Sequence, residues 1–231
     1  MGYRRILVHG LGGTSKTPAC VFFVWRKIGK QPTYLQLPSL SEDAAHFYDL
    51  AQSLNSVPEG NVGIILDELD KLCDREVIGW LCKTLDLEFL TVGITNDPTY
   101  LRRNIQPIWR RFADTGILIY SAPPDYRERI SIVRSVLERL NTRIAKEEER
   151  KLAKVLEGFN FSQICQLLRR AEKRKRISSS MILKLITNGN IQPSSSAEDE
   201  RRYLLGLQNI QGWDIRLSDS YHERKKRSPH R

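Results

Sequence analysis

The segment GLGGTSKT, from Gly10 to Thr17, decides the fold that this sequence predicts. It follows the apolar, β-branched run Ile6 to His9 and precedes a helical stretch from Ala19 to Ile28. A glycine-rich loop between a strand and a helix turns tightly and aims its main-chain N–H groups inward, beside the positive end of the helix. This arrangement binds phosphate. Lys16 would reach the β- and γ-phosphates of a nucleoside triphosphate, and the Thr17 hydroxyl would coordinate Mg²⁺.

One position departs from the usual form of such a loop, because Ser15 precedes the lysine where glycine is usual. Serine is the mildest replacement, but it adds a Cβ where glycine is conformationally free. For the loop on its own, the alternative is a glycine-rich turn without function. The phosphate-binding residues that we predict are Gly10, Gly12, Gly13, Thr14, Ser15, Lys16 and Thr17.

A second motif, GIILDELD at residues 63–70, strengthens the case for phosphate chemistry. It is an apolar strand that ends in acids, about fifty residues after the loop. We expect Asp67 to hold the water shell of a magnesium ion, and Glu68 to orient and polarise the attacking water. The alternative is that Asp67, Glu68 and Asp70 only cap the next helix, where acids are favoured. The presence of the loop favours catalysis, with Lys16 and Glu68 as its central residues.

Strands and helices alternate in the first half of the chain, which predicts a parallel α/β sheet. Helical stretches lie between the strands, among them Ala19 to Ile28 and Ala44 to Leu54. Several strands are apolar throughout, as expected for strands covered by helices on both faces. The five strands that we predict are residues 6–9, 33–37, 62–66, 90–95 and 117–120.

Only helices are predicted after Tyr120. Asp125 can cap a helix with Glu128 reaching back to it, and the apolar face of that helix continues to Leu140. Further helices are expected at residues 146–156, from about 162, and at 180–186. The predicted fold is therefore a five-stranded parallel P-loop sheet flanked by helices and followed by a small helical lid domain. The expected limits are 1–122 for the core, 123–191 for the lid, and 192–231 for a linker, a short helix near 198–207 and a partly disordered basic tail.

The composition is that of a soluble protein, with 40% hydrophobic and 28% charged residues among 231. No apolar run reaches the roughly 18 residues that span a bilayer, and the apolar stretch near Met1 is too short for a signal peptide, so we expect a cytoplasmic protein. The cysteines form no CxxC pair, which argues against a zinc site or a disulfide framework and favours buried free thiols. They are Cys20, Cys73, Cys82 and Cys165.

The formal charge of +10 is concentrated in two segments. Residues 169–176 carry six basic residues and one acid, and residues 223–231 carry five basic residues and one acid. Local basicity of this kind indicates either nucleic-acid contacts or solvated surfaces. The second interpretation is favoured for both segments.

Taken together, the motifs resemble those of the AAA+ ATPase family. After GLGGTSKT and IILDELD, the run from Val92 to Leu137 holds a polar strand end, an arginine–phenylalanine pair, a strand, a proline turn and an arginine-containing helix in the family's order. The segment GFNFSQI at residues 158–164 is similar to the start of a lid helix in AAA proteins. The resemblance covers about Ile6 to Arg174. The matching positions in the run are Thr95-Asn96, Arg111-Phe112, residues 117–120, Pro123-Pro124-Asp125 and Arg129.

The resemblance implies roles for individual residues. Asn96 would be the sensor that hydrogen-bonds the attacking water or the γ-phosphate, although Asn96-Asp97-Pro98 is also a good turn signal. Arg111, or Arg110 as the alternative, would be an arginine finger that reaches the nucleotide of a neighbouring subunit in a ring. A solvated surface or a pair with Asp114 is the competing interpretation of these arginines.

Arg169 and Arg170 lie where some AAA+ branches place a second sensor. Their helical spacing puts them opposite the face of Ile164 and Leu167, which favours a solvated surface instead.

Two departures from the family affect the expected function. The loop begins within ten residues of Met1, so a preceding segment that helps to hold adenine is not expected, and Ala45-His46-Phe47-Tyr48 lacks the glycine of a polypeptide-threading pore loop. The leading hypothesis is an ATP- and Mg²⁺-dependent ATPase that forms a ring and remodels a macromolecular partner. The alternatives are a DNA-acting switch that resembles initiators or helicase loaders, and a nucleotide-gated interaction module with little hydrolysis.

Overall fold

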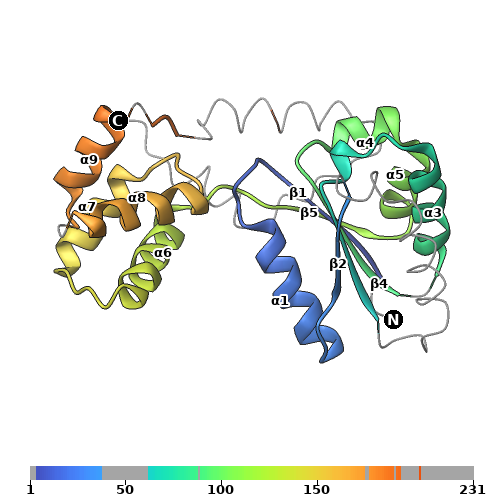
Figure 1. Cartoon of the computed structure of the whole chain (residues 1–231), viewed down its shortest axis with the longest axis horizontal. Coiled ribbons are helices and arrows are strands. Elements are labelled where there is room, and N and C mark those ends of the chain that lie inside the picture. The colour runs from blue at the N-terminus through green and yellow to red at the C-terminus, as the bar shows by residue number, and fades with distance from the viewer. Residues whose placement is uncertain are drawn as a thin grey trace, which may run out of the picture.

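The computed structural model describes residues 4–37, 62–87, 89–174, 177–189, 191–193 and 203. Figure 1 shows two units, an α/β unit that contains the sheet and a helical unit that follows the last strand. An extended segment after β5 (Ile117–Tyr120) leads from the first unit to the second. The elements near this junction position the candidate site.

The sheet has five parallel strands in the order β2-β3-β4-β1-β5. β1 (Arg5–His9) lies between β4 (Leu90–Thr95) and β5, and β3 (Gly63–Asp67) lies between β2 (Thr33–Gln36) and β4. All five residues of β3 are buried, so this strand is covered on both faces, as its continuous apolar run predicts.

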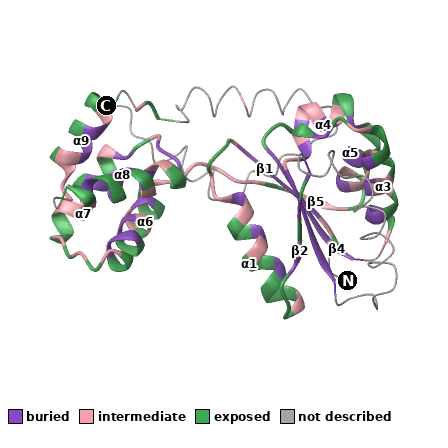
Figure 2. Cartoon of the chain, in the orientation of Figure 1, coloured by how far each residue is buried: buried purple, intermediate pink, exposed green. Residues whose placement is uncertain are grey.

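Helices cover both faces of the sheet (Figure 2). α1 (Lys16–Ile28) lies on one face, where Cys20 and Val24 pack against buried residues of β1, β3 and β4. The opposite face packs against α3 (Arg75–Asp86), α4 (Pro98–Asn104) and α5 (Gln106–Ala113). Each of these helices is amphipathic, so burial of its apolar side stabilises the unit.

Parallel strands place their carboxyl ends at one edge of the sheet, and the polar residues of the sequence motifs lie there. Gly10 follows β1, Asp67 ends β3, and Asn96 follows β4. The register pairs His9 with Thr95 and Leu66 with Gly93, which sets these three strand ends at the same level. Polar side chains gathered at this edge are typical of ligand sites in open parallel sheets.

The helical unit consists of α6 (Tyr126–Arg139), α7 (Lys146–Val155), α8 (Phe161–Lys173) and α9 (Ser179–Asn188), which share one hydrophobic core. α6 begins with the predicted capping box, in which Asp125 accepts from the N–H of Glu128 at 2.8 Å and Glu128 accepts in return at 2.7 Å. Arg129 is buried and donates to the carbonyls of Ala153 at 2.7 Å and Pro124 at 2.9 Å, so it fixes α6 against α7.

The predicted strands agree with the structure to within one residue at each end, and the parallel sheet is confirmed. α1 begins at Lys16, three residues before the helical stretch that the sequence predicts, because Pro18 fits the first turn of a helix. The expected helix at 44–54, the region of 45–48 and the basic segment 223–231 lie outside the described residues, and of the expected helix at 198–207 only Tyr203 is described. The domain limits stay a prediction.

The four cysteines are free thiols. Only Cys20 is buried, and Cys73 is exposed, so the prediction that they are all buried is wrong. Cys73 lies in the short link before α3, where the chain returns to the surface. Among the helices that the structure describes, none has both the length and the apolar character that crossing a membrane requires.

Candidate active site

The loop from Gly10 to Thr17 turns through conformations that favour glycine. Gly10 has a φ of 148° and Gly13 a φ of 76°. A Cβ at Gly10 would lie 2.4 Å from the carbonyl oxygen of Ser121, and one at Gly13 would lie 2.2 Å from Nδ2 of Asn160. Both glycines are therefore required by close neighbours as well as by backbone conformation.

Ser15 adopts the left-handed conformation that glycine favours, with φ 62° and ψ 28°. Its side chain makes no capping hydrogen bond to α1. A non-glycine residue in this region costs roughly 1–2 kcal/mol. The loop thus keeps the backbone of a phosphate-binding loop although it lacks the glycine that would relieve this strain.

Lys16 is buried, and its ammonium group is held by oxygens of the loop and of the end of β4, with a longer bond of 3.4 Å to Oγ1 of Thr14. Nζ donates to the carbonyls of Gly10 at 2.9 Å and Leu11 at 2.8 Å, and to Oδ1 of Asn96 at 2.8 Å. Burial lowers the pKa of Lys16, and the charges of Asp67 and Asp70 oppose this shift. The structure therefore brings together the predicted lysine and the predicted sensor, which are 80 positions apart.

Thr17 and Asp67 also meet at this edge. The Thr17 hydroxyl donates to Oδ2 of Asp67 at 2.7 Å, and the main-chain N–H of Glu68 donates to Oδ1 at 2.8 Å. The hydroxyl at the end of the loop and the carboxylate at the end of β3 are the hard oxygen ligands that Mg²⁺ prefers. The two residues predicted to hold the metal therefore fit a magnesium ion.

The sequence motifs did not indicate Tyr34, which also contacts Asp67. Its hydroxyl donates to Oδ2 at 2.7 Å from the neighbouring strand β2. The register pairs Gln36 with Asp67, so Tyr34, two residues earlier on β2, lies on the same face of the sheet and diagonal to Asp67. An aromatic residue within a short strand has no pattern that distinguishes this role from ordinary packing.

Glu68 lies just beyond Asp67 with a φ of 61°, so its backbone is also left-handed. Its carboxylate accepts from Nζ of Lys71 and, at 3.3 Å, from Nε2 of Gln36. The hydrogen bond from Lys71 is the main cause that lowers the pKa of Glu68. Glu68 is therefore a carboxylate at the rim of the site, and its side chain is directed toward Lys71 and Gln36.

Asp67 and Asp70 make other contacts than the capping of α3 that the alternative interpretation expects. The residue that caps α3 is Asp74, which accepts from the N–H groups of Glu76 and Val77. Asp70 accepts instead from Oγ1 of Thr95 at 2.9 Å and from the N–H of Asn96 at 2.8 Å. Asp70 thus fixes the end of β4 and the backbone of Asn96.

A cleft of about 710 Å³ lies between the two units, with the loop and the strand ends on one side and α6 and α8 on the other. The side chain of Asn160, which caps α8, donates to the carbonyl of Gly12 at 3.2 Å and joins the two walls. A cleft of this size is in the range of small-molecule sites. Its helical wall offers apolar side chains, including Ile132, Val136 and Phe161, and the cations Arg139 and Arg169.

Both arginines are exposed, and each lowers the pKa of Cys165 electrostatically, against the larger and opposite effect of its burial, so each guanidinium group lies in the neighbourhood of Cys165, which also lines the cleft. Arg169 therefore faces the cleft although the sequence favours a solvated surface for it, while Arg170 is exposed and is not part of the lining. Sequence reasoning missed Arg139, because a single arginine at a helix end gives no signal.

Arg111 lies away from the cleft, on α5. Its guanidinium donates to both carboxylate oxygens of Asp86, at 2.8 and 2.7 Å, and to the carbonyl of Pro107 at 3.0 Å. This hydrogen-bonded pair raises the pKa of Arg111 and lowers that of Asp86. The acid partner is thus Asp86 and not Asp114, while Arg110 is exposed.

Comparisons with known proteins support the fold through structure alone. No family model and no curated protein sequence matches the chain. A crystal structure of the FIGL-1 AAA domain in complex with ADP is similar over 91% of this chain and 79% of its own, with a TM-score of 0.73 and 19% identity.

Two proteins of Thermotoga maritima are also similar. For the RuvB Holliday junction branch migration motor the TM-score is 0.65 at 20% identity, over 86% of this chain and only 66% of the RuvB chain. For domain III of the replication initiation protein DnaA the TM-score is 0.58 at 19% identity, over 80% of this chain and 84% of that one. With the glycine-rich loop and the acidic strand end in place on a parallel sheet of order β2-β3-β4-β1-β5, the chain has the AAA+ P-loop fold.

Proposed function

We infer that the chain binds ATP in the cleft and hydrolyses it with Mg²⁺. The observation that carries this inference is the convergence of Lys16, Asn96, Thr17 and Asp67 within hydrogen-bond distance at one sheet edge. The structure of the FIGL-1 AAA domain contains ADP, which supports nucleotide binding for the shared fold.

In this function the loop binds the phosphates through its main-chain N–H groups and the start of α1. Lys16 exchanges the carbonyls of Gly10 and Leu11 for phosphate oxygens, which keep its buried charge solvated. Thr17 and Asp67 would hold the magnesium ion, which supplies charge neutralisation at the β- and γ-phosphates.

Glu68 would act on the attacking water. As a carboxylate it can accept a proton from that water once its side chain leaves Lys71 and Gln36. Asn96, held by Asp70 through its main-chain N–H, would orient the water or the γ-phosphate with its amide. In this proposal the side chain of Glu68 must turn away from Lys71 and Gln36 and toward the attacking water before hydrolysis can occur.

An arginine finger from a neighbouring copy would complete the site. Arg111 can serve only after its two hydrogen bonds to Asp86 open, whereas Arg110 is exposed on the same helix. A finger supplied by another subunit contributes about 10³–10⁵ to the rate, so turnover would depend on assembly. Self-association into a ring is part of this proposal, as is the remodelling of a macromolecular partner by the nucleotide cycle.

The decisive experiment measures Mg²⁺-dependent ATP turnover as a function of protein concentration, with the particle mass determined in parallel with and without ATP. Lys16→Ala should abolish both binding and turnover. Glu68→Gln should bind ATP and stop turnover. Normal hydrolysis by Glu68→Gln would show that the base is assigned wrongly. Tight ATP binding with negligible turnover at high concentration would select the nucleotide-gated module, which the strained Ser15 favours.

A second function, a DNA-acting AAA+ switch, is favoured by the exposure of the basic end of α8. Arg169, Arg170, Lys173 and Arg174 are all exposed. Two structural neighbours are described as a Holliday junction motor and a replication initiation protein. Duplex DNA binding through such residues should weaken with salt at a log–log slope of about −0.9 for each phosphate contact. Absence of binding at low salt would exclude this function.

A further inference from the structure

The outer side of α1 carries a group of exposed aromatic side chains that the ATPase chemistry does not use. Phe22, Phe23 and Trp25 are exposed by 61%, 44% and 47%, and the rings of Phe22 and Trp25 lie 5.9 Å apart. Large aromatic side chains are seldom left this exposed together on one helix without a partner.

The same helix is strongly basic. Arg26 and Lys27 lie in its last turn, Lys30 follows its end, and all three are exposed. α1 contains no acidic residue. None of the three cations forms an ion pair with another residue in the described part of the chain. Unpaired cations on a surface attract a polyanion, and aromatic rings beside them can stack on flat ring systems of the same ligand.

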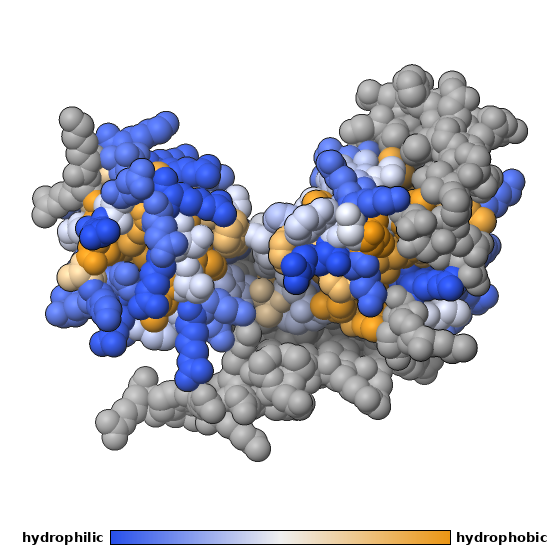
Figure 3. All heavy atoms as spheres, turned by 90° about the horizontal axis from the view of Figure 1, so that it is seen from below, coloured by the Kyte–Doolittle hydropathy of each residue, from blue (hydrophilic) through white to orange (hydrophobic). Residues whose placement is uncertain are grey.

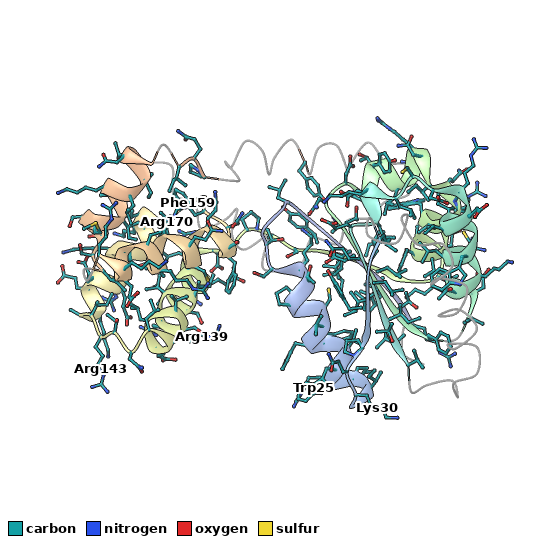
Figure 4. The ribbon with its side chains drawn as sticks, in the orientation of Figure 1. Trp25, Lys30, Arg139, Arg143, Phe159 and Arg170 are labelled. Atoms are coloured by element: carbon teal, nitrogen blue, oxygen red, sulfur yellow. The ribbon has the colours of Figure 1, made fainter. Side chains whose placement is uncertain are left out.

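Cations of the helical unit face the same side of the molecule. In Figure 4, Arg139 in the last turn of α6 and Arg143 in the loop after it lie toward the bottom of the view, as do Trp25 of α1 and Lys30 just beyond its end. Both arginines are exposed. Figure 3 views the molecule from this side and shows hydrophobic and hydrophilic side chains interspersed on the α/β unit beside the hollow.

We propose that this surface, formed by α1 from Phe22 to Lys30 with Arg139 and Arg143 opposite, binds single-stranded nucleic acid. Phosphates would contact the cations, and unpaired bases would stack on Phe22 and Trp25. Each stacked base contributes about 1–3 kcal/mol in known single-strand binders, which corresponds to roughly five- to 150-fold in affinity. In a duplex the bases are covered by their neighbours, so the aromatic rings select single strands.

The experiment measures the anisotropy of a fluorescein-labelled dT20 strand bound to the full chain without nucleotide, with a 20-base-pair duplex in parallel. Because no ATP is present, its outcome is independent of the ATPase proposal. Phe22→Ala/Trp25→Ala should weaken dT20 binding by about tenfold or more and leave duplex binding unchanged. Arg26→Gln/Lys27→Gln should reduce the log–log salt slope by about 1.4, because each phosphate that a cation neutralises on a single strand adds about 0.7 to the slope.

The matched control is Arg102→Gln/Arg103→Gln, which removes two cations from the last turn of α4, a helix whose one aromatic side chain, Tyr100, packs against the core. This variant should keep the affinity and the salt slope of the wild type. Circular dichroism of every variant confirms folding.

Equal dT20 affinity for the wild type and Phe22→Ala/Trp25→Ala would overturn the proposal. An equal loss in the Arg102/Arg103 control would also overturn it, since any positive charge would then suffice. If the aromatic variant keeps its dT20 affinity and light scattering shows a smaller particle, the face is a contact between copies of this chain.

Discussion

The two walls of the cleft differ in how their charges are satisfied. On the α/β wall, Lys16, Asp67 and Asp70 are held by hydrogen bonds between strand ends. On the helical wall, Arg139 and Arg169 are exposed and form no ion pair within the described residues. Side chains that are already fixed by hydrogen bonds lose little conformational entropy when a ligand binds. Unpaired cations, in contrast, gain a new electrostatic partner when an anionic ligand binds. The α/β wall therefore suits catalysis, and the helical wall suits affinity.

The largest effect should come from the α/β wall, with Asp67→Asn. The amide oxygen still accepts from Thr17 or Tyr34, but the charge that would hold the metal is lost. We expect ATP turnover to fall by about 10²–10³-fold, as for the loss of one preorganised electrostatic group. The free energy of unfolding should change by less than about 1 kcal/mol.

Steady-state turnover and urea denaturation measure the two quantities. Asp114→Asn, an exposed acid that follows α5 and does not line the cleft, provides a control for the loss of one acid. Unchanged turnover in Asp67→Asn would remove this residue from the metal site.

The next effect tests how tightly the α/β wall is packed behind the loop. His9, directly before Gly10, is buried beside Tyr120 and hydrogen-bonded through Nδ1 to the hydroxyl of Tyr203 at 2.8 Å. Burial, with a smaller contribution from Lys16, lowers the pKa of His9 from 6.5 to about 4. The unfolded chain then binds the proton first, so stability is present above pH 6.5 and is lost as pH falls toward 4.

A shift of this size corresponds to about 3 kcal/mol between pH 7 and pH 4. Urea denaturation across this range measures the change in the free energy of unfolding. In His9→Gln this free energy should depend less on pH than in the wild type. Tyr203→Phe should lower stability by about 1 kcal/mol at pH 7, because one buried hydrogen bond is lost. If the pH dependence of His9→Gln equals that of the wild type, the imidazole is not the group that titrates.

The helical wall should show a moderate effect on binding and none on stability. Arg139→Gln/Arg169→Gln removes both cations from the cleft, and we expect ATP affinity to fall about tenfold, or about 1.4 kcal/mol. Fluorescence titration with a labelled ATP analogue measures this. Arg170→Gln is the matched control, since it removes a neighbouring cation of α8 that does not line the cleft. An equal loss in the control would show that the effect is general electrostatics.

The sequence predicted the α/β wall well because its residues are tied to local patterns. The glycine-rich loop, the apolar strand with its acids and the polar end of β4 each follow a strand, and parallel strands bring such ends together. Tyr34, Arg139 and the partner of Arg111 could not be predicted in this way. Their contacts depend on strand register and on how helices pack, and neither leaves a periodic signal in the chain.

Ser15 carries the smallest expected effect and the sharpest test of the loop. Ser15→Gly relieves the left-handed strain of about 1–2 kcal/mol, and the greater entropy of glycine in the unfolded chain offsets part of it. We expect the free energy of unfolding to rise by about 0.5–1 kcal/mol. Urea denaturation with Ser15→Ala as control separates backbone from hydroxyl, because alanine keeps the Cβ.

A gain in Ser15→Ala equal to that in Ser15→Gly would attribute the effect to the hydroxyl and contradict the strain. A gain confined to glycine, together with tighter ATP binding, would mean that the strained serine weakens the hold of the loop on phosphate. The weak point of the loop would then be the one position where serine stands in for the usual glycine, although the backbone there keeps the usual conformation.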